Sequence, residues 1–344
     1  MGYSALIAMS GGVDSAVAAL LTQRECAFCA GATMVLFGDS FKEQSLDSLG
    51  LPGLDMPFYT FDFREEFSSC VITPFIDEYY NARTPNPCVV CNNRLKFGAF
   101  LDKALEMGMD YIVTGHYAQI ECDSNGRWLL KKGVDKDKDQ SYVLYTLTQK
   151  QLAHTKLPLG ALTKNEVRKI AQDAGLPNAG GKESQDICFI PDGDYAGFII
   201  RHTGKAPKKG RFVDANGNDL GENKGLLHYT VGQRRGLGLS MPHPPYVTRL
   251  CALSNTVVVG KNEQLYSKTF EAKNINLITN NKLEAPIKAQ VKIRYKDPGH
   301  PALVTQTDED TIHVEFDEPQ RAITKGQSAV MYDNNIVIGG GIIV

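Results

Sequence analysis

A short turn near the N-terminus, Ser10-Gly-Gly-Val-Asp-Ser15, constrains the fold of this chain more than any other segment. It follows an apolar run at residues 5–9, which predicts a buried strand, and it precedes residues 15–24, which are rich in helix formers. Two glycines let the backbone approach a phosphate closely, and the N-terminus of the next helix offers unpaired N–H groups. The order of strand, glycine turn and helix predicts an α/β domain with an anion-binding loop.

The carboxylate of Asp14 is unexpected inside such a loop, because it repels phosphate. We interpret Asp14 either as a partner of Mg²⁺ or as a support for the shape of the loop. The turn lacks the G-x-x-x-x-G-K-[ST] pattern, so it is not a Walker loop.

Strand and helix patterns alternate through the first half of the chain. Apolar runs at residues 31–37, 58–61 and 111–114 predict strands, and residues 65–81 and 93–107 predict helices. This alternation favours a parallel sheet with helices on both faces. A capping box, Thr163-Lys-Asn-Glu166, predicts the start of a further helix that ends near residue 174.

The pattern changes near residue 204, where Gly and Pro become frequent and short strand patterns replace helical periodicity. Longer strand patterns follow residue 270. The sequence therefore predicts three domains: a catalytic α/β domain at residues 1–203, a small β-rich domain at 204–268 and a β-barrel at 269–344.

Charge is unevenly distributed along the chain. The formal net charge is −2, yet residues 201–300 contain 17 Lys and Arg against 7 Asp and Glu. A basic segment in an acidic chain favours a polyanionic partner such as nucleic acid. The alternative is a solvated basic surface without a partner.

The composition favours a cytoplasmic protein without a membrane anchor. No apolar run approaches the roughly 20 residues that a membrane-spanning helix needs, and the first residues lack the pattern of a signal peptide. Eight cysteines in such a chain are not expected to form a disulfide framework. We interpret the pair Cys26 and Cys29 as structural.

The second pair, in Cys88-Val-Val-Cys91, precedes the helix predicted at residues 93–107. A position near a helix N-terminus, with Arg94 and Lys96 close in sequence, predicts a lowered pKa and a reactive thiolate for Cys91. Cys188 follows Ser184-Gln-Asp-Ile and lies beside an apolar segment. Taken alone, Cys188 is equally well explained as a buried core thiol.

The loop at residues 10–15 resembles the pyrophosphate loop of the N-type ATP pyrophosphatases, which adenylate a carbonyl oxygen before a nucleophile displaces AMP. Segments along nearly the whole chain resemble one branch of that superfamily, the tRNA-specific 2-thiouridylase family. The matching segments are residues 10–15, 83–87, 91–92, 96–97, 114–117, 138–142, 162–164, 166–171, 187–190, 229–236, 294–295, 326–329 and 339–342.

This resemblance implies an α/β N-terminal domain with a Rossmann-like parallel sheet, followed by two small mainly-β domains, the last a β-barrel. It also implies that ATP, with Mg²⁺, activates the 2-carbonyl of the wobble uridine of tRNA, and that sulfur then displaces AMP. A sulfur-donor protein, either a persulfide carrier or a cysteine desulfurase, would be a second partner.

The resemblance further implies roles for individual residues. The ATP site would comprise Ala8, Met9, Ser10, Gly11, Gly12, Val13, Asp14, Ser15, Met34 and Gly115. Cys91 would be the catalytic nucleophile, and Cys188 would carry the sulfur as a persulfide. The target base would lie against Asn86, Pro87 and Cys88. Contacts with tRNA would come from His116, Lys138, Asp139, Gln140, Arg294, Tyr295 and Gln327.

Cys88 departs from the family pattern, because many relatives have an acidic residue there. With Cys91 and Cys188 it offers three thiolates, which could hold a [4Fe–4S] cluster with one open iron. The alternatives are a persulfide route, a Cys91–Cys188 disulfide switch with Cys88 as a bystander, and, less well matched, a zinc site. His116 has the alternative of a satisfied core histidine.

Two other functions remain open at this point. One is an ATP pyrophosphatase that forms an amide or guanidine on a small metabolite, and the other is an RNA-binding protein with an inactive ATPase domain. The segment at residues 38–55 is shorter than the helical insertion of many relatives, which affects the contacts made there rather than the chemistry.

Overall fold

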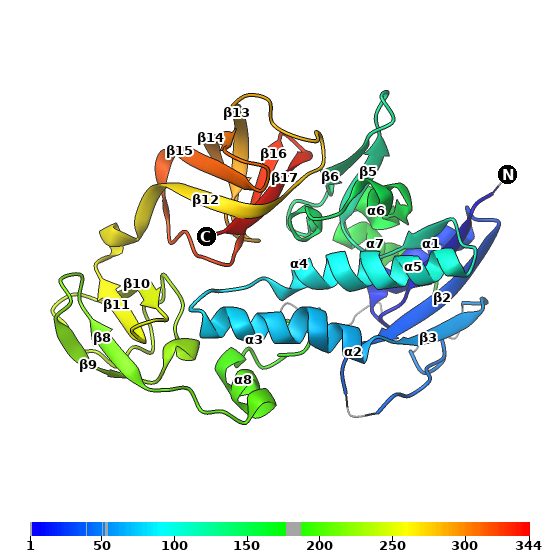
Figure 1. Cartoon of the computed structure of the whole chain (residues 1–344). Coiled ribbons are helices and arrows are strands. Elements are labelled where there is room, and N and C mark those ends of the chain that lie inside the picture. The colour runs from blue at the N-terminus through cyan, green and yellow to red at the C-terminus, as the bar shows by residue number, and fades with distance from the viewer. Residues whose placement is uncertain (1, 39, 50, 52–53, 177–186) are drawn as a thin grey trace.

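The computed structural model describes residues 2–38, 40–49, 51, 54–176 and 187–344. Figure 1 shows three bodies: an α/β domain formed by the first half of the chain, a small sheet domain and a C-terminal barrel. The predicted fold class is confirmed, because a parallel sheet is followed by two mainly-β domains, of which the last is a closed barrel.

A five-stranded parallel sheet forms the centre of the α/β domain, in the order β3-β2-β1-β4-β7. Its strands are β1 (Ser4–Ala8), β2 (Phe28–Val35), β3 (Phe58–Asp62), β4 (Tyr111–Val113) and β7 (Thr155–Lys156). The strand order runs outward from β1 in both directions. The switch point of the sheet therefore lies between β1 and β4, where ligands of open α/β sheets bind at the carboxyl edge.

Alternate residues of β1 direct their side chains to opposite faces of the sheet. Ala5 and Ile7 pack with α1 (Val13–Gln23) and α7 (Lys164–Asp173). Leu6 packs with the helices on the other face. Those helices are α2 (Arg64–Phe67), a π-helical segment (Ser68–Ile72), α3 (Thr73–Tyr80), α4 (Pro87–Cys91), a second π-helical segment (Asn92–Ala99) and α5 (Phe100–Glu106). The predicted capping box is confirmed, because Thr163 and Glu166 cap α7 reciprocally.

The small sheet domain is a four-stranded sheet in the order β10-β11-β8-β9. It follows α8 (Tyr195–Thr203), and its strands are β8 (Gly210–Val213), β9 (Asp219–Asn223), β10 (Tyr246–Cys251) and β11 (Thr256–Gly260). Its own core includes Phe212, Tyr229 and Val257. A 3₁₀ turn at Leu226–His228 contacts α3 and α8, which attaches this domain to the helical face of the α/β domain (Figure 1).

Six antiparallel strands close into the C-terminal barrel in the order β12-β15-β14-β13-β16-β17, and β12 pairs with β17 to complete the ring. The strands are β12 (Tyr266–Leu277), β13 (Ile287–Lys292), β14 (His300–Gln306), β15 (Thr311–Arg321), β16 (Ser328–Asp333) and β17 (Ile336–Ile343). Closure leaves few free strand edges, and buried Val, Ile and Phe side chains fill the interior.

A hairpin of the α/β domain extends the barrel sheet. Its strands are β5 (Ala118–Cys122) and β6 (Trp128–Lys132), and β6 pairs with β17 at Lys131 and Ile336. Tyr142 and Tyr332 belong to one buried cluster that spans the α/β domain and the barrel. The helix α6 (Gln149–Ala153) packs on β6. The barrel is therefore part of a continuous core and not a separate appendage.

Among the helices that the structure describes, none combines the length and the apolar character needed to cross a membrane.

Candidate functional site

The glycine turn lies at the switch point of the sheet, directly after β1. The Ser15 hydroxyl donates to the Gly12 carbonyl at 2.9 Å and accepts from the Ser10 backbone N–H at 3.2 Å. Gly11 has φ +75°, a conformation that favours glycine. Gly12 is the N-cap of α1, so the first N–H groups of this helix face the turn without a side-chain cap. This arrangement suits a phosphate group.

The other residues predicted for the nucleotide site come together at the same edge. Ala8 ends β1 and Met9 follows it, Met34 lies near the end of β2, and Gly115 follows β4 by two residues. A Cβ atom on Gly115 would lie 2.9 Å from the Asp14 carbonyl carbon, so only glycine allows the two backbones to pack this closely. The predicted set is therefore one spatial group.

The carboxylate of Asp14 is engaged by two residues. Its Oδ1 accepts hydrogen bonds from Lys164 Nζ at 2.6 Å and from the Tyr117 hydroxyl at 2.7 Å. Lys164 is only 5% exposed. Of the two interpretations of Asp14, support of the loop is the one that these contacts favour. Sequence reasoning missed the contact of Lys164 with Asp14, although Lys164 stands in one of the segments on which the resemblance rests.

The helix that carries the cysteines begins at Pro87, with Pro at its first position as helices favour, and not at residue 93. Cys91 therefore lies one turn inside the helix, is 7% exposed and packs in the core. Burial raises the pKa of Cys91 to about 11, and the nearby ammonium of Lys96 offsets only part of this effect. The predicted lowering of the Cys91 pKa is wrong.

The other two thiols lie close to Cys91. Partial desolvation raises the pKa of Cys88 and of Cys188, although both residues are exposed at the surface, and Lys96 opposes the increase in each case. The charge of a Cys188 thiolate would raise the pKa values of Cys88 and Cys91. Three thiols and one ammonium are thus electrostatic neighbours. Residues 184–186, which precede the matched segment at residues 187–190, lie outside the described residues.

A [4Fe–4S] cluster requires three or four thiolates directed at one point. Within the described part of the chain, no three Cys, His, Asp or Glu side chains are grouped so that they could hold a metal ion. Cys91 is in the core, whereas Cys88 and Cys188 are at the surface. The arrangement of these three cysteines does not fit a cluster.

His116 is buried beneath the same region. It is 8% exposed, its Nδ1 lies 2.8 Å from the Thr114 hydroxyl, and its ring centroid is 5.5 Å from that of Phe97. Burial, and then the charge of Lys96, hold its pKa well below the usual value, so the imidazole is neutral at pH 7. His116 is therefore placed as a buried core histidine, the alternative considered above. Its ring does not lie on the surface, where it could contact tRNA.

The segment Lys138-Asp139-Gln140 packs against the strand-connecting loops. Asp139 Oδ1 accepts hydrogen bonds from the backbone N–H groups of Gly133 and Ser141, and Gln140 Oε1 accepts from Tyr117 N–H at 2.9 Å. Lys138 is half-buried. Asp139 and Gln140 therefore shape the loop that presents Lys138.

The barrel contributes three residues to the same region. Gln327 donates to the Thr84 carbonyl at 2.8 Å, just before the segment Asn86–Cys88. The Tyr295 ring meets that of Tyr142 edge-on, with ring centroids 6.0 Å apart. Burial, and then the charges of Asp139 and Cys88, raise the pKa of Tyr295. Arg294 is exposed and donates to the Arg321 carbonyl at 2.6 Å. The fold therefore brings Tyr295 near Cys88 and Gln327 against Thr84, whereas the hydrogen bond of Arg294 lies within the barrel.

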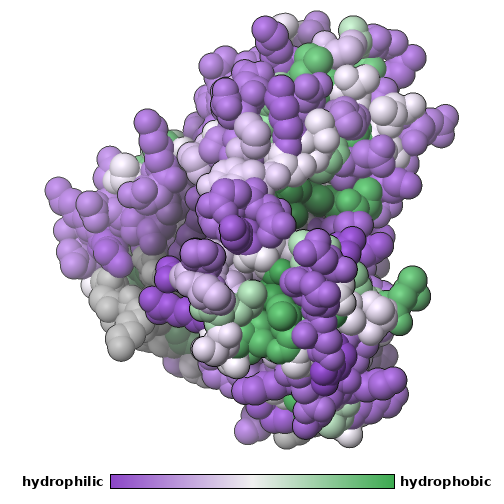
Figure 2. Space-filling model, turned by 90° about the vertical axis from the view of Figure 1, so that its left-hand side faces the viewer, coloured by the Kyte–Doolittle hydropathy of each residue, from purple (hydrophilic) through white to green (hydrophobic). Residues whose placement is uncertain are grey.

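Basic side chains on the small sheet domain are partly neutralised. Lys209 pairs with Glu222 at 2.7 Å, and Arg211 pairs with Asp219. Exposed basic residues that also lie in this domain are Lys205, Lys208, Lys224, Arg234 and Arg235. Figure 2, which looks at the molecule from this side, shows a mostly hydrophilic surface with a recess that contains hydrophobic residues.

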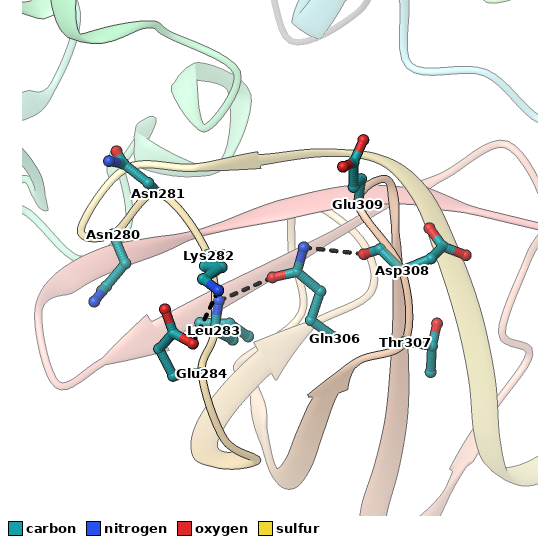
Figure 3. A pocket seen from close by; sticks show the side chains of 9 residues that line it. All are labelled: Asn280, Asn281, Lys282, Leu283, Glu284, Gln306, Thr307, Asp308 and Glu309. Atoms are coloured by element: carbon teal, nitrogen blue, oxygen red, sulfur yellow. Dashed lines mark hydrogen bonds and ion pairs between the residues drawn. The ribbon is translucent and has the colours of Figure 1, made fainter.

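A surface cavity of about 830 Å³ lies on the barrel, away from these residues (Figure 3). Several of its polar side chains already have partners within the cavity wall. Gln306 accepts from Leu283 N–H and donates to the Asp308 carbonyl, and Lys282 pairs with Glu284. None of the predicted site residues lines this cavity.

Comparisons with known proteins cover the whole chain. Three family models match consecutive parts of the chain. They are a tRNA methyl transferase HUP domain at residues 4–192, a tRNA methyl transferase PRC-barrel domain at 196–261 and an aminomethyltransferase β-barrel domain at 267–343. The tRNA-specific 2-thiouridylase MnmA of Clostridioides difficile (strain 630) is 47% identical over 100% of this chain and 98% of its own length. The proteins of the same name from Halothermothrix orenii and Acetivibrio thermocellus are 47% and 46% identical over 98% of both chains.

Proposed function

This chain belongs to the tRNA-specific 2-thiouridylase family, and we propose that it replaces the 2-oxygen of the wobble uridine of tRNA with sulfur in an ATP-dependent reaction. One observation carries the proposal: three thiols gather around Lys96 beside the barrel, within the α/β domain that also holds the glycine turn. An amide-forming enzyme of the same superfamily would have no use for this group of thiols.

The first step is adenylation of the base. The turn at residues 10–15 and the N-terminus of α1 hold the phosphates of ATP, which enters as its Mg²⁺ complex. The 2-oxygen of uracil attacks the α-phosphorus, the bond to the pyrophosphate breaks, and pyrophosphate stays in the turn until release. The 2-oxygen then carries AMP and has become a leaving group.

The second step delivers sulfur. The terminal sulfur of a Cys188 persulfide bonds to C2 of the base, and the bond between C2 and the oxygen that carries AMP breaks. Cys91, which is protonated at rest, loses its proton and attacks the inner sulfur of Cys188, which leaves the outer sulfur on the base and forms a Cys91–Cys188 disulfide. An external thiol reduces the disulfide, and a sulfur-donor protein reloads Cys188. Cys88 lies beside the base and is not needed for this exchange.

The remaining parts of the chain bind the substrate. Asn86, Pro87 and Cys88 lie against the flipped base, and Lys138, Arg294, Tyr295 and Gln327 contact the anticodon arm nearby. The domains at residues 204–268 and 269–344 hold the body of the tRNA through phosphate contacts, in keeping with the excess of Lys and Arg in residues 201–300. The reaction takes place in the cytoplasm.

The test combines the purified chain with ATP, Mg²⁺, sulfide and unmodified tRNA, and measures 2-thiouridine at the wobble position by mass spectrometry. Pyrophosphate release that depends on tRNA is the second expected result. No thiolated product under either aerobic or anaerobic conditions overturns the proposal, and pyrophosphate release without tRNA assigns the chain to a small-molecule ATP pyrophosphatase.

The sulfur route has its own test. We expect protein without iron to retain thiolation activity, and Cys88→Ala to keep much of it, whereas Cys91→Ser and Cys188→Ser lose it. An iron-dependent activity together with an inactive Cys88→Ala variant would replace the persulfide route with a cluster.

A further inference from the structure

A buried lysine stands behind the glycine turn. Lys164 Nζ lies 2.6 Å from Asp14 Oδ1 and is the first residue of α7, far from the turn in sequence. The Tyr117 hydroxyl donates to the same carboxylate oxygen at 2.7 Å. Two elements other than α1 therefore converge on the carboxylate of the turn.

The position of Lys164 is fixed by its own backbone. Its N–H donates to Asp135 Oδ2 at 2.9 Å, and the capping box of Thr163 and Glu166 holds the first turn of α7. A lysine that is 5% exposed requires a negative partner, because a buried charge without one is strongly destabilising. Asp14 is such a partner.

The backbone of Asp14 is closely packed as well. The backbone of Gly115 packs so closely on that of Asp14 and Ser15 that a Cβ atom there would lie 2.9 to 3.0 Å from their backbone atoms. Tyr117 belongs to the same short segment after β4. The backbone of Asp14 is thus packed on Gly115, and its carboxylate, which stays 34% exposed, is held by Lys164 and Tyr117.

A carboxylate next to a polyphosphate repels it, and an ammonium at hydrogen-bond distance cancels this repulsion. We propose that Lys164 is a positioning residue for the pyrophosphate turn: it neutralises Asp14 and fixes it against Tyr117, so that the turn accepts the phosphates of ATP while Asp14 supports the loop and does not serve as a metal ligand. This inference rests on the proposed function only in taking ATP as the ligand of the turn.

The test measures the equilibrium binding of ATP to the full chain without tRNA, by dialysis with labelled ATP, with and without Mg²⁺. The variants are Lys164→Met, which removes the ammonium partner of the carboxylate, Asp14→Asn, which removes the negative charge, and Asp14→Asn/Lys164→Met, which removes both charges. Lys169→Met is the matched control, because Lys169 is an exposed lysine of the same helix. Far-UV circular dichroism and thermal melts verify the fold of each variant.

We expect Lys164→Met to weaken ATP binding at least tenfold, the double variant to return to within about fivefold of the wild type, and Lys169→Met to bind as the wild type does. Recovery of ATP binding in the double variant distinguishes the explanations. A lysine that only stabilises the fold, or one that contacts phosphate directly, would not give this recovery. If Lys164→Met does not fold, the ATP affinity of the double variant is compared directly with that of the wild type. An affinity within the same fivefold limit then supports the inference, and a weaker one overturns it.

Three results overturn the inference: wild-type affinity in Lys164→Met, no recovery in the double variant, or an Asp14→Asn variant whose ATP binding loses its dependence on Mg²⁺. The last result would make Asp14 a metal ligand. If the wild type itself does not bind ATP, the proposed function fails instead, so the two failures are distinguishable.

Discussion

The raised pKa of Cys91 predicts an unusual pH dependence for the alkylation of this thiol. Burial raises the pKa to about 11, which keeps Cys91 protonated at neutral pH. Only the thiolate reacts with iodoacetamide. At pH 8 a thiol with this pKa is roughly 0.1% ionised, against roughly a quarter for an ordinary cysteine with a pKa of about 8.5. Ionisation alone therefore makes Cys91 roughly 200-fold less reactive.

We expect the alkylation rate of Cys91, measured by peptide mass spectrometry, to rise about tenfold per pH unit from pH 7 to pH 10 without a plateau. The sign follows from the raised pKa, because the proton leaves only as the pH approaches 11. The slope does not depend on how easily the reagent reaches the core, since access affects all pH values equally while the fold is intact. Circular dichroism at each pH checks that condition.

Lys96→Met should slow the reaction at every pH in this range, because the ammonium that lowers the Cys91 pKa is lost. Lys103→Met, whose exposed side chain pairs with Glu106 on the same continuous helix, is the matched control and should react as the wild type does. A plateau below pH 9, or an unchanged rate in Lys96→Met, would refute the assignment of burial and Lys96 as the opposing causes.

Three further predictions concern stability and substrate binding. Thr163→Ala removes the N-cap of α7 and should lower the free energy of unfolding by about 1 kcal/mol in a denaturant titration, whereas Thr279→Ala, in a half-buried position outside any helix or strand, should not. Gly340→Ala places a Cβ atom 2.4 Å from the Ala329 carbonyl oxygen and 2.8 Å from the Tyr145 ring, between the barrel and the α/β domain, and should cost about 1–3 kcal/mol or more in the same assay. Binding of tRNA should weaken at least about tenfold between 50 and 200 mM salt in a filter-binding assay, because phosphate contacts displace counterions; salt-independent binding would contradict this.

Local sequence patterns were sufficient for the parallel sheet and its turn. The strands predicted at residues 5–9 and 58–61 agree with β1 and β3 to within one residue, and the capping box marks the start of α7. These features depend on short-range periodicity and on backbone capping, which the sequence records directly.

Features that depend on distant contacts were not predictable in this way. The helix with Cys91 begins at Pro87, before its apolar periodicity is evident, so the burial of Cys91 and the direction of its pKa shift were missed. The partnership of Asp14 with Lys164 joins residues 150 positions apart, and no local pattern encodes it. The residues that pair β6 with β17 are separated by an even longer stretch of sequence.

That last pairing has a consequence during synthesis on the ribosome. The edge of β6 emerges ~200 residues before Ile336, its partner on β17. At about 5–20 residues per second, this leaves the β5–β6 hairpin with an open strand edge for about 10–40 s. The apolar neighbours of Tyr332 and Val337 in the shared core stay uncovered for the same interval. A prematurely terminated chain never closes this edge, so aborted translation products should be distinguishable from finished protein by chaperones and proteases.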